Sequence, residues 1–149
     1  MQIRQMQDSD FQQVLSMMET FYASDALLIH PPRAVLERTL TDAIGQCPFV
    51  QGFAFDAGDT LAGYGMVAHS YSTEAGGPCV WIEDIYVLPQ FRGKGWGTAF
   101  LSFVQQQYED RVVRIRLEAE PENTRAMAVY RKAGYEVLGY TQLVKEFEK

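Results

Sequence analysis

The chain has 149 residues, which corresponds to one domain large enough to bury about two-thirds of its unfolded surface. Apolar residues make up 47% of the chain and aromatic residues 13%, the profile of a folded protein rather than a disordered one. Thirteen basic against 19 acidic residues give a net charge of −6, so no broad positive field exists to gather nucleic acid.

The N-terminal residues lack the apolar core of a signal peptide, and no later stretch approaches the roughly 18 apolar residues of a membrane span. We therefore expect a cytoplasmic protein with no membrane partner. The two cysteines, Cys47 and Cys79, form no CxxC pattern, and His30 and His69 have no partner at ligand spacing. The sequence therefore predicts reduced, structural thiols and no metal site.

The apolar pattern and the turn residues predict a single α/β domain over residues 1–149. In chain order they predict a strand at 2–6, a helix capped by Asp8, a second helix opened by His30-Pro31-Pro32, and a hairpin of strands at 49–57 and 60–72. There follow a strand at 80–88, a glycine-rich loop at 92–97, a helix at 97–109, a strand at 112–118, a helix at 124–132, and terminal strands at 135–139 and 142–147. This order, β-α-α-β-β-β-α-β-α-β-β, predicts a mixed central sheet with helices on both faces.

Three glycines, Gly93, Gly95 and Gly97, separate a predicted strand from the helix after it. Glycine permits positive φ and has no Cβ, so successive backbone N–H groups can turn toward one anion. The start of the helix adds its unpaired N–H groups, and Arg92 and Lys94 add full charges. Two linked phosphates suit such a loop, although a surface turn with glycine for steric reasons remains open. The spacing fits neither the GxGxxG dinucleotide fingerprint nor a Walker loop.

Two adjacent carboxylates, Glu83 and Asp84, lie in the strongest predicted strand. A buried ionised carboxylate needs hydrogen bonds, a cation or a watery cleft, so each has a structural and a functional interpretation. For Asp84 the structural interpretation includes an ion pair with an arginine. Alternation across the sheet predicts one face with Glu83, Trp81, Ile85 and Val87, and an opposite face with Asp84, Ile82 and Tyr86.

The segment from Asn123 to Tyr135 predicts a short helix with Asn123 at its N-cap and Gly134 at its C-terminal end. Ala126 and Tyr130 then lie on one helical face. The helical spacing alone favours an interpretation of Tyr130 as a core residue whose hydroxyl reaches a carbonyl.

Arg92, Gly95 and Gly97 satisfy the pattern Arg/Gln-x-x-Gly-x-Gly/Ala, and with the element order they resemble the GNAT superfamily of acetyl-CoA-dependent N-acetyltransferases over nearly the whole chain. The runs Ile-Glu-Asp-Ile-Tyr-Val-x-Pro and Asn-x-x-Ala-x-x-x-Tyr look most like the spermidine/spermine branch. The resemblance implies the GNAT fold, acetyl-CoA as co-substrate without a metal, and direct transfer of an acetyl group to a primary amine.

By the same resemblance, Glu83 is the general base that removes a proton from the amine, and Tyr130 is the general acid that protonates the departing thiolate. Asn123 would bond to the cofactor arm, although a pure N-cap role remains open. The residues implied to contact the cofactor are Ile85, Tyr86, Val87, Arg92, Gly93, Lys94, Gly95, Trp96, Gly97, Thr98, Asn123 and Ala126. Those implied to bind the amine are Glu19, Tyr22, Asp25, Glu83 and Asp84, beside a core residue, Phe21.

A polyamine or another small cationic amine is the leading acceptor, ahead of a lysine side chain, an amino acid or an aminoglycoside. Two other classes stay open: a non-catalytic acetyl-CoA-binding module, and an amide-forming enzyme that uses a longer acyl-CoA. Because an edge strand invites partners, the apolar terminal strands also predict a homodimer.

Overall fold

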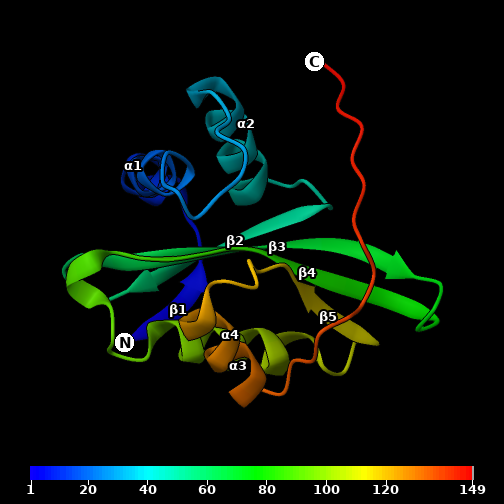
Figure 1. Ribbon diagram of the computed structural model, residues 1–149. Helices are drawn as coiled ribbons and strands as arrows, with labels where there is room; N and C mark the ends of the chain where they lie inside the picture. Colours follow the sequence, from blue (N-terminus) through cyan, green and yellow to red (C-terminus); the bar gives the residue numbers. More distant parts are fainter. Residues whose placement is uncertain (149) are drawn as a thin grey trace.

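The computed structural model describes residues 1–148, which form a five-stranded sheet between two helical layers (Figure 1). The strand order is β1-β2-β3-β4-β5. Neighbours from β1 to β4 pair antiparallel, whereas β4 and β5 pair parallel, so the predicted mixed sheet is confirmed. The strands are β1 (Gln2–Gln5), β2 (Val50–Asp56), β3 (Leu61–Ser72), β4 (Gly77–Val87) and β5 (Arg114–Leu117).

Helices cover both faces of the sheet, as the sequence predicts (Figure 1). One layer consists of α1 (Phe11–Tyr22) and α2 (Arg33–Ile44), and the other of α3 (Trp96–Tyr108) and α4 (Thr124–Lys132). Short 3-10 turns at Asp8–Asp10 and Pro89–Phe91 lead toward α1 and α3. The predicted helices and the first five predicted strands therefore form, with small differences at their ends.

Two apolar clusters hold these layers together, one on each face of the sheet. On the α1 side, Leu15 and Met18 pack against Tyr64 of β3. On the α3 side, Phe55 of β2 packs against Phe100, with ring centroids 5.1 Å apart. Each large side chain buried in this way contributes about 1.5–3 kcal/mol, so both layers anchor the central strands firmly.

A bulge in the β3–β4 ladder changes the predicted faces of β4. Glu83 has no partner residue on β3. An extra residue shifts the alternation of side chains by one position. Ile82 therefore packs in the same cluster as Ile85, on the α3 side, whereas Asp84 faces α1. The predicted grouping of Ile82 with Asp84 and Tyr86 is wrong for this reason.

The two predicted terminal strands are also wrong for this chain: residues 136–148 form no strand. They leave the end of α4, run past the β5 side of the sheet and project away from the body (Figure 1). No backbone hydrogen bond joins them to another described residue. Alternating apolar residues favour an extended chain, but a strand forms only where its backbone groups meet a partner.

Several other sequence expectations concern side chains and helices rather than strands. Cys47 and Cys79 are both free thiols, the first half-buried and the second buried. Within residues 1–148, no three His, Cys, Asp or Glu side chains gather as metal ligands. No helix in the same range has the length and apolar character needed to cross a bilayer.

Candidate active site

The candidate site is built at the carboxyl half of β4, where the sheet is open on one side. The pairing of β4 with β5 ends where Ile82 meets Leu117. Leu88 N–H donates to a β3 carbonyl at 2.8 Å, so the alternation of the strand directs the N–H groups of Val87 and Ile85 to the opposite, unpaired edge. Such an edge can bind an amide-containing chain as it would bind an added strand.

The glycine-rich loop lies between this edge and the start of α3. Gly93 and Gly95 have φ angles of +75° and +88°, which glycine adopts without strain, and Gly95 is the N-cap of α3. A Cβ on Gly93, Gly95 or Gly97 would meet no protein atom within 4 Å. Gly97 lies inside the helix without a positive φ, so the fold itself does not require glycine there. The open space favours a group from outside the chain at the predicted anion site.

Arg92 is held against the end of β4. Its Nε donates to Val87 O at 2.9 Å, and its guanidinium lies 5.7 Å from the centroid of the Tyr86 ring. Tyr86 itself is buried on the α1 side, 5.4 Å from the Phe21 ring, and its backbone pairs with Tyr64 of β3. Among the predicted cofactor contacts, Tyr86 is therefore placed to position Arg92 rather than to meet a ligand at the unpaired edge.

The remaining loop residues differ in exposure. Lys94 is exposed and its Nζ lies 5.6 Å from the Phe91 ring, so its charge is free to turn toward an anion. The Trp96 indole is buried and stacks on Phe55 at 5.9 Å, which leaves its backbone as the group available at the start of α3. Thr98 is exposed in the first turn.

Glu83 lies at the bulge with its side chain exposed. Partial burial of its carboxyl raises its pKa, and the neighbouring carboxylates of Asp84 and Glu118 raise it further. A carboxylate with a raised pKa is a better proton acceptor than an ordinary one, because its basicity lies closer to neutral pH. The influence of Glu118 is not visible in the sequence pattern, since it arises only when the ends of β4 and β5 are brought together.

Asp84, the residue after Glu83, is buried. Its carboxylate accepts hydrogen bonds from Tyr22 Oη at 2.6 Å and from Tyr64 Oη at 2.8 Å. Burial raises the pKa of Asp84, while the two hydroxyl donors act in the opposite direction. Burial, and then the charge of Asp84, raises the pKa of both tyrosines, which keeps them protonated as donors. The structural hydrogen bonds considered for Asp84 are therefore present, with tyrosines rather than an arginine as partners.

Helix α4 presents the predicted acid. Asn123 Oδ1 accepts the backbone N–H of Ala126 at 3.2 Å, so its N-cap role is confirmed, and Gly134 has a φ of +96°. The Tyr130 ring packs edge-on against Tyr135 at 6.4 Å, and burial raises the pKa of Tyr130. Within residues 1–148 its hydroxyl has no hydrogen-bond partner in the protein. A protonated, unpartnered hydroxyl is suited to give its proton to a leaving group.

The predicted amine-binding residues divide into two groups. Tyr22 reaches Asp84 and therefore lies beside Glu83. Glu19, by contrast, pairs with Arg33 of α2 at 2.9 Å, and Asp25 is exposed in the connection from α1 to α2. Phe21 packs against the apolar cluster on the α1 side, which confirms its place in the core.

The candidate site thus combines a glycine-rich loop, an unpaired strand edge, an exposed carboxylate and a tyrosine hydroxyl without a partner among the described residues. The model of the acetyltransferase (GNAT) family matches residues 12–135, and the chain belongs to that family. The predicted family and its acyltransferase class are thus confirmed.

Relatives of known name agree with this assignment. The chain is 29% identical over 141 residues to a thialysine N-epsilon-acetyltransferase of Mus musculus, covering 89% of this chain and 82% of that protein. It is 32% identical over 107 residues to the Bos taurus protein of the same name, covering 66% of this chain and 62% of the relative. The chain therefore spans less than two-thirds of the bovine relative.

Solved structures share the fold. An integron cassette protein, HFX_CASS3, from the mobile metagenome of Cole Harbour Salt Marsh superposes with a TM-score of 0.81 at 25% identity, covering 99% of this chain and 91% of that one. AAC(6')-Iy in complex with the bisubstrate analogue CoA-S-monomethyl-acetylneamine superposes with a TM-score of 0.73 at 22% identity, covering 99% and 97%. The GNAT fold predicted from the sequence is confirmed.

Proposed function

We propose that the protein transfers an acetyl group from acetyl-CoA directly to the primary amine of a small cationic molecule. The observation that carries this proposal is the position of Glu83. It is an exposed carboxylate with a raised pKa, located between the unpaired edge of β4 and the Tyr22–Asp84 pair. A proton acceptor at this point can serve an amine that approaches a thioester held along the strand.

The residues of the glycine loop fit the diphosphate of coenzyme A. Gly93 and Gly95 turn the loop, the open space at Gly97 admits a phosphate at close range, and Arg92 and Lys94 balance its charge. Acetyl-CoA supplies the activated acetyl group as a thioester. Every other task in the reaction falls to side chains and backbone groups of this chain.

Glu83 performs the first of these tasks by accepting a proton from the ammonium group. At pH 7 a primary amine with a pKa of about 10.4 is neutral in only roughly one molecule in two thousand, so a base at this position increases the reactive fraction. The amine nitrogen then bonds to the acetyl carbon as the carbon–sulfur bond breaks. Tyr130 donates its hydroxyl proton to the sulfur and regains one from solvent, while Glu83 releases its proton to solvent.

The backbone N–H of Val87 is directed to the same edge and can donate to the acetyl oxygen as negative charge grows there. Holding both reactants together supplies up to about 7–11 kcal/mol, whereas each proton-transferring group typically adds about 10²–10⁴-fold. Positioning of the reactants along β4 therefore makes the larger contribution to the reaction rate, and proton transfer by Glu83 and Tyr130 makes a smaller one.

The surroundings of Glu83 favour a cationic acceptor. Asp84 and Glu118 add negative charge, and Tyr22 offers an aromatic ring beside them. The name of the mouse relative denotes an Nε-amine of a small amino acid, which supports an acceptor with a primary amine on a flexible chain. We place polyamines and thialysine-like amines in this class, ahead of protein lysines and aminoglycosides.

Release of coenzyme A thiol, measured against a matched panel of amines, tests the proposal. The panel contains spermidine, putrescine, thialysine, lysine, a lysine peptide and an aminoglycoside. We expect the highest kcat/KM for a small di- or polyamine or for thialysine, and a large loss with Glu83→Gln. Preference for the lysine peptide or the aminoglycoside would contradict the acceptor class. Binding of acetyl-CoA without turnover of any amine would favour a non-catalytic module instead.

A further inference from the structure

Arg116 on β5 carries a positive charge that the proposed reaction does not use. Its Cζ lies 4.2 Å from the centroid of the Trp81 ring on β4, and the two residues are partners in the parallel pairing of these strands. Both side chains are half-buried, so part of the stack is accessible to solvent. A guanidinium that stacks on an indole keeps its N–H groups free for a ligand, because the contact uses only its flat face.

No carboxylate among the described residues pairs with Arg116. Within residues 1–148 its guanidinium forms neither an ion pair nor a side-chain hydrogen bond. Hydrogen bonds from Tyr140 and Arg114 are the main reasons that the pKa of Glu74 is lowered, and the charge of Arg116 contributes less. Glu74 is therefore already engaged by other partners. A half-buried guanidinium without a counter-charge is suited to a carboxylate, which it can bind through two parallel N–H···O bonds.

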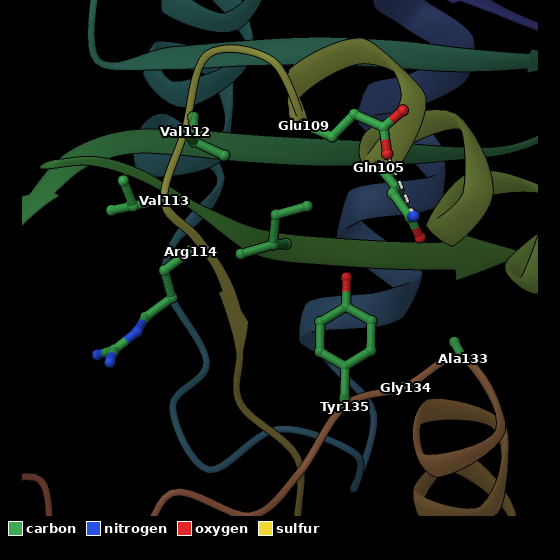
Figure 2. A pocket seen from close by; sticks show the side chains of 9 residues that line it. Gln105, Glu109, Val112, Val113, Arg114, Ala133, Gly134 and Tyr135 are labelled. Carbon is green, nitrogen blue, oxygen red and sulfur yellow. Dashed lines mark hydrogen bonds between the residues drawn. The ribbon is translucent and has the colours of Figure 1, made fainter. Parts of the chain in front are cut away.

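Arg116 lies on the face of the sheet that bears the proposed acceptor site. Its two neighbours on β5 pack in the apolar cluster on the α3 side, so alternation directs Arg116 to the opposite face. Figure 2 shows the Arg114 side chain, two residues earlier on β5, directed away from α3 in the same way. Asp84 reaches Tyr22 of α1 on this face as well. The guanidinium and the carboxylates around the proposed base therefore share one side of the sheet.

The acceptor site is acidic at one end and basic at the other. Burial, and then the carboxylates of Asp84 and Glu118, raise the pKa of Glu83, so the end beside Glu83 favours a cation. Arg116 precedes Glu118 by two residues on β5, and Trp81 precedes Glu83 by two residues on β4. At about 3.3 Å per residue, the two ends lie roughly 7 Å apart along the strands. A flexible stem of about four carbons, like that of lysine, covers a distance of this order.

The acceptor molecule is the source of an anion at this position, because the proposed site for the phosphates of the coenzyme lies at the glycine loop. We propose that Arg116 selects acceptors that carry a carboxylate at the end opposite the reacting amine. The substrate is then a small amino acid with a side-chain amine rather than a polyamine. This assignment rests on the proposed function, since it names the acceptor of that same site. The second ammonium group of a diamine would lie beside the guanidinium and be repelled, so Arg116 also acts against polyamines.

Matched pairs of acceptors test the role of Arg116. Lysine and cadaverine share one skeleton and differ by the carboxylate, as do thialysine and the diamine that its decarboxylation would give. We expect the native enzyme to have the higher kcat/KM for the amino acid of each pair. Arg116→Gln should lower the ratio of the two kcat/KM values by about 10- to 100-fold, mainly through the KM of the amino acid. Activity toward the diamine should stay the same or rise, whereas a folding defect would lower both.

Two further variants separate the charge of Arg116 from its packing. Arg116→Lys keeps the charge but not the planar fork, so its ratio should lie between the native value and that of Arg116→Gln. Arg111→Gln is the matched control. The guanidinium of Arg111 also stacks on an aromatic ring, that of Tyr108 at 5.1 Å, but it belongs to the turn after α3, so the ratio should stay native.

Calorimetry with the coenzyme A complex compares the binding of each pair without turnover. We expect the native protein to bind the amino acid more tightly than the diamine, and Arg116→Gln to lose this difference. A native protein that treats both members alike, or a ratio that Arg116→Gln leaves unchanged, would overturn the assignment. Absence of thiol release with every amine would refute the proposed function itself. The calorimetric comparison would then still support or overturn the binding of a carboxylate by Arg116.

Discussion

Glu118, just beyond the end of β5, raises the pKa of Glu83 on β4, because parallel pairing brings the carboxyl ends of the two strands together. Two neighbouring carboxylates resist ionisation together. The proposed base is therefore less acidic than an isolated glutamate, and its protonation state is coupled to a residue that performs no chemistry itself.

The first prediction concerns this coupling. Glu118→Gln removes one negative charge, so the pKa of Glu83 falls. Since Glu83 acts in its deprotonated form, the acid limb of kcat/KM should move to lower pH while the plateau is retained. The pH profile with the preferred amine measures the shift, and Glu122→Gln, in the exposed loop before α4, serves as control. An acid limb that stays in place, or moves to higher pH, would remove Glu118 from this role.

The second prediction concerns Tyr130, whose hydroxyl has no partner among the described residues. Tyr130→Phe keeps the ring and its packing but removes the donated proton. We expect kcat to fall by about 10²-fold or more, while the affinity for coenzyme A measured by calorimetry stays the same. Tyr135→Phe is the matched control, because that ring packs edge-on against Tyr130 but points into the groove between α3, β5 and the turn after α4 (Figure 2). Equal losses in both variants would indicate packing rather than proton transfer.

Local signals in the sequence specify much of this site. Gly93 and Gly95 require positive φ, and Asn123 caps α4, so the loop and the helix start can be predicted from residue chemistry alone. The bulge at Glu83 cannot be predicted in this way, because it depends on how β3 and β4 fit between two helical layers. The hydrogen bond from Tyr64 to Asp84 cannot be predicted from the sequence for the same reason, since the two residues meet only in the folded sheet.

The terminal segment shows a different limit. The alternation at 142–147 predicts a strand, but within residues 1–148 this segment pairs with no other strand, because alternation alone does not specify a pairing partner. The described chain supplies this segment and the β5 edge without joining them. Strand pairing is a property of two partners, so a pattern within one segment leaves it undetermined.

The third prediction separates folding from ligand binding in the glycine loop. A Cβ on Gly97 meets no protein atom, and the residue is helical, so Gly97→Ala should leave stability unchanged or raise it by about 0.5–1 kcal/mol. The added methyl group occupies space proposed for a phosphate, so affinity for coenzyme A should fall. Gly95→Val, at a φ of +88°, should weaken both stability and binding. Full affinity in a stable Gly97→Ala protein would place the anion site elsewhere.

The fourth prediction tests the junction between β1 and the start of α1. Asp10 accepts hydrogen bonds from Arg4 at 2.8 and 3.1 Å and from the backbone N–H of Gln7 at 2.8 Å. The Arg4 hydrogen bond is the main reason that the pKa of Asp10 lies below its ordinary value. Asp10→Asn should lower the free energy of unfolding at pH 7 by about 1–3 kcal/mol, because charged hydrogen bonds are lost from a nearly buried group.

The stability that Asp10 contributes should decrease as the pH falls. A carboxyl with a depressed native pKa stabilises the fold above its unfolded pKa of about 3.9, and that contribution is lost as pH falls through the lower native value. The difference between native protein and Asp10→Asn, measured by urea unfolding, should therefore be full at pH 7 and shrink as the pH drops below the ordinary range of aspartate. Asp56→Asn removes the second, more exposed partner of Arg4 and should have a smaller effect. A difference that is independent of pH would mean that Asp10 acts through its shape and not through its charge.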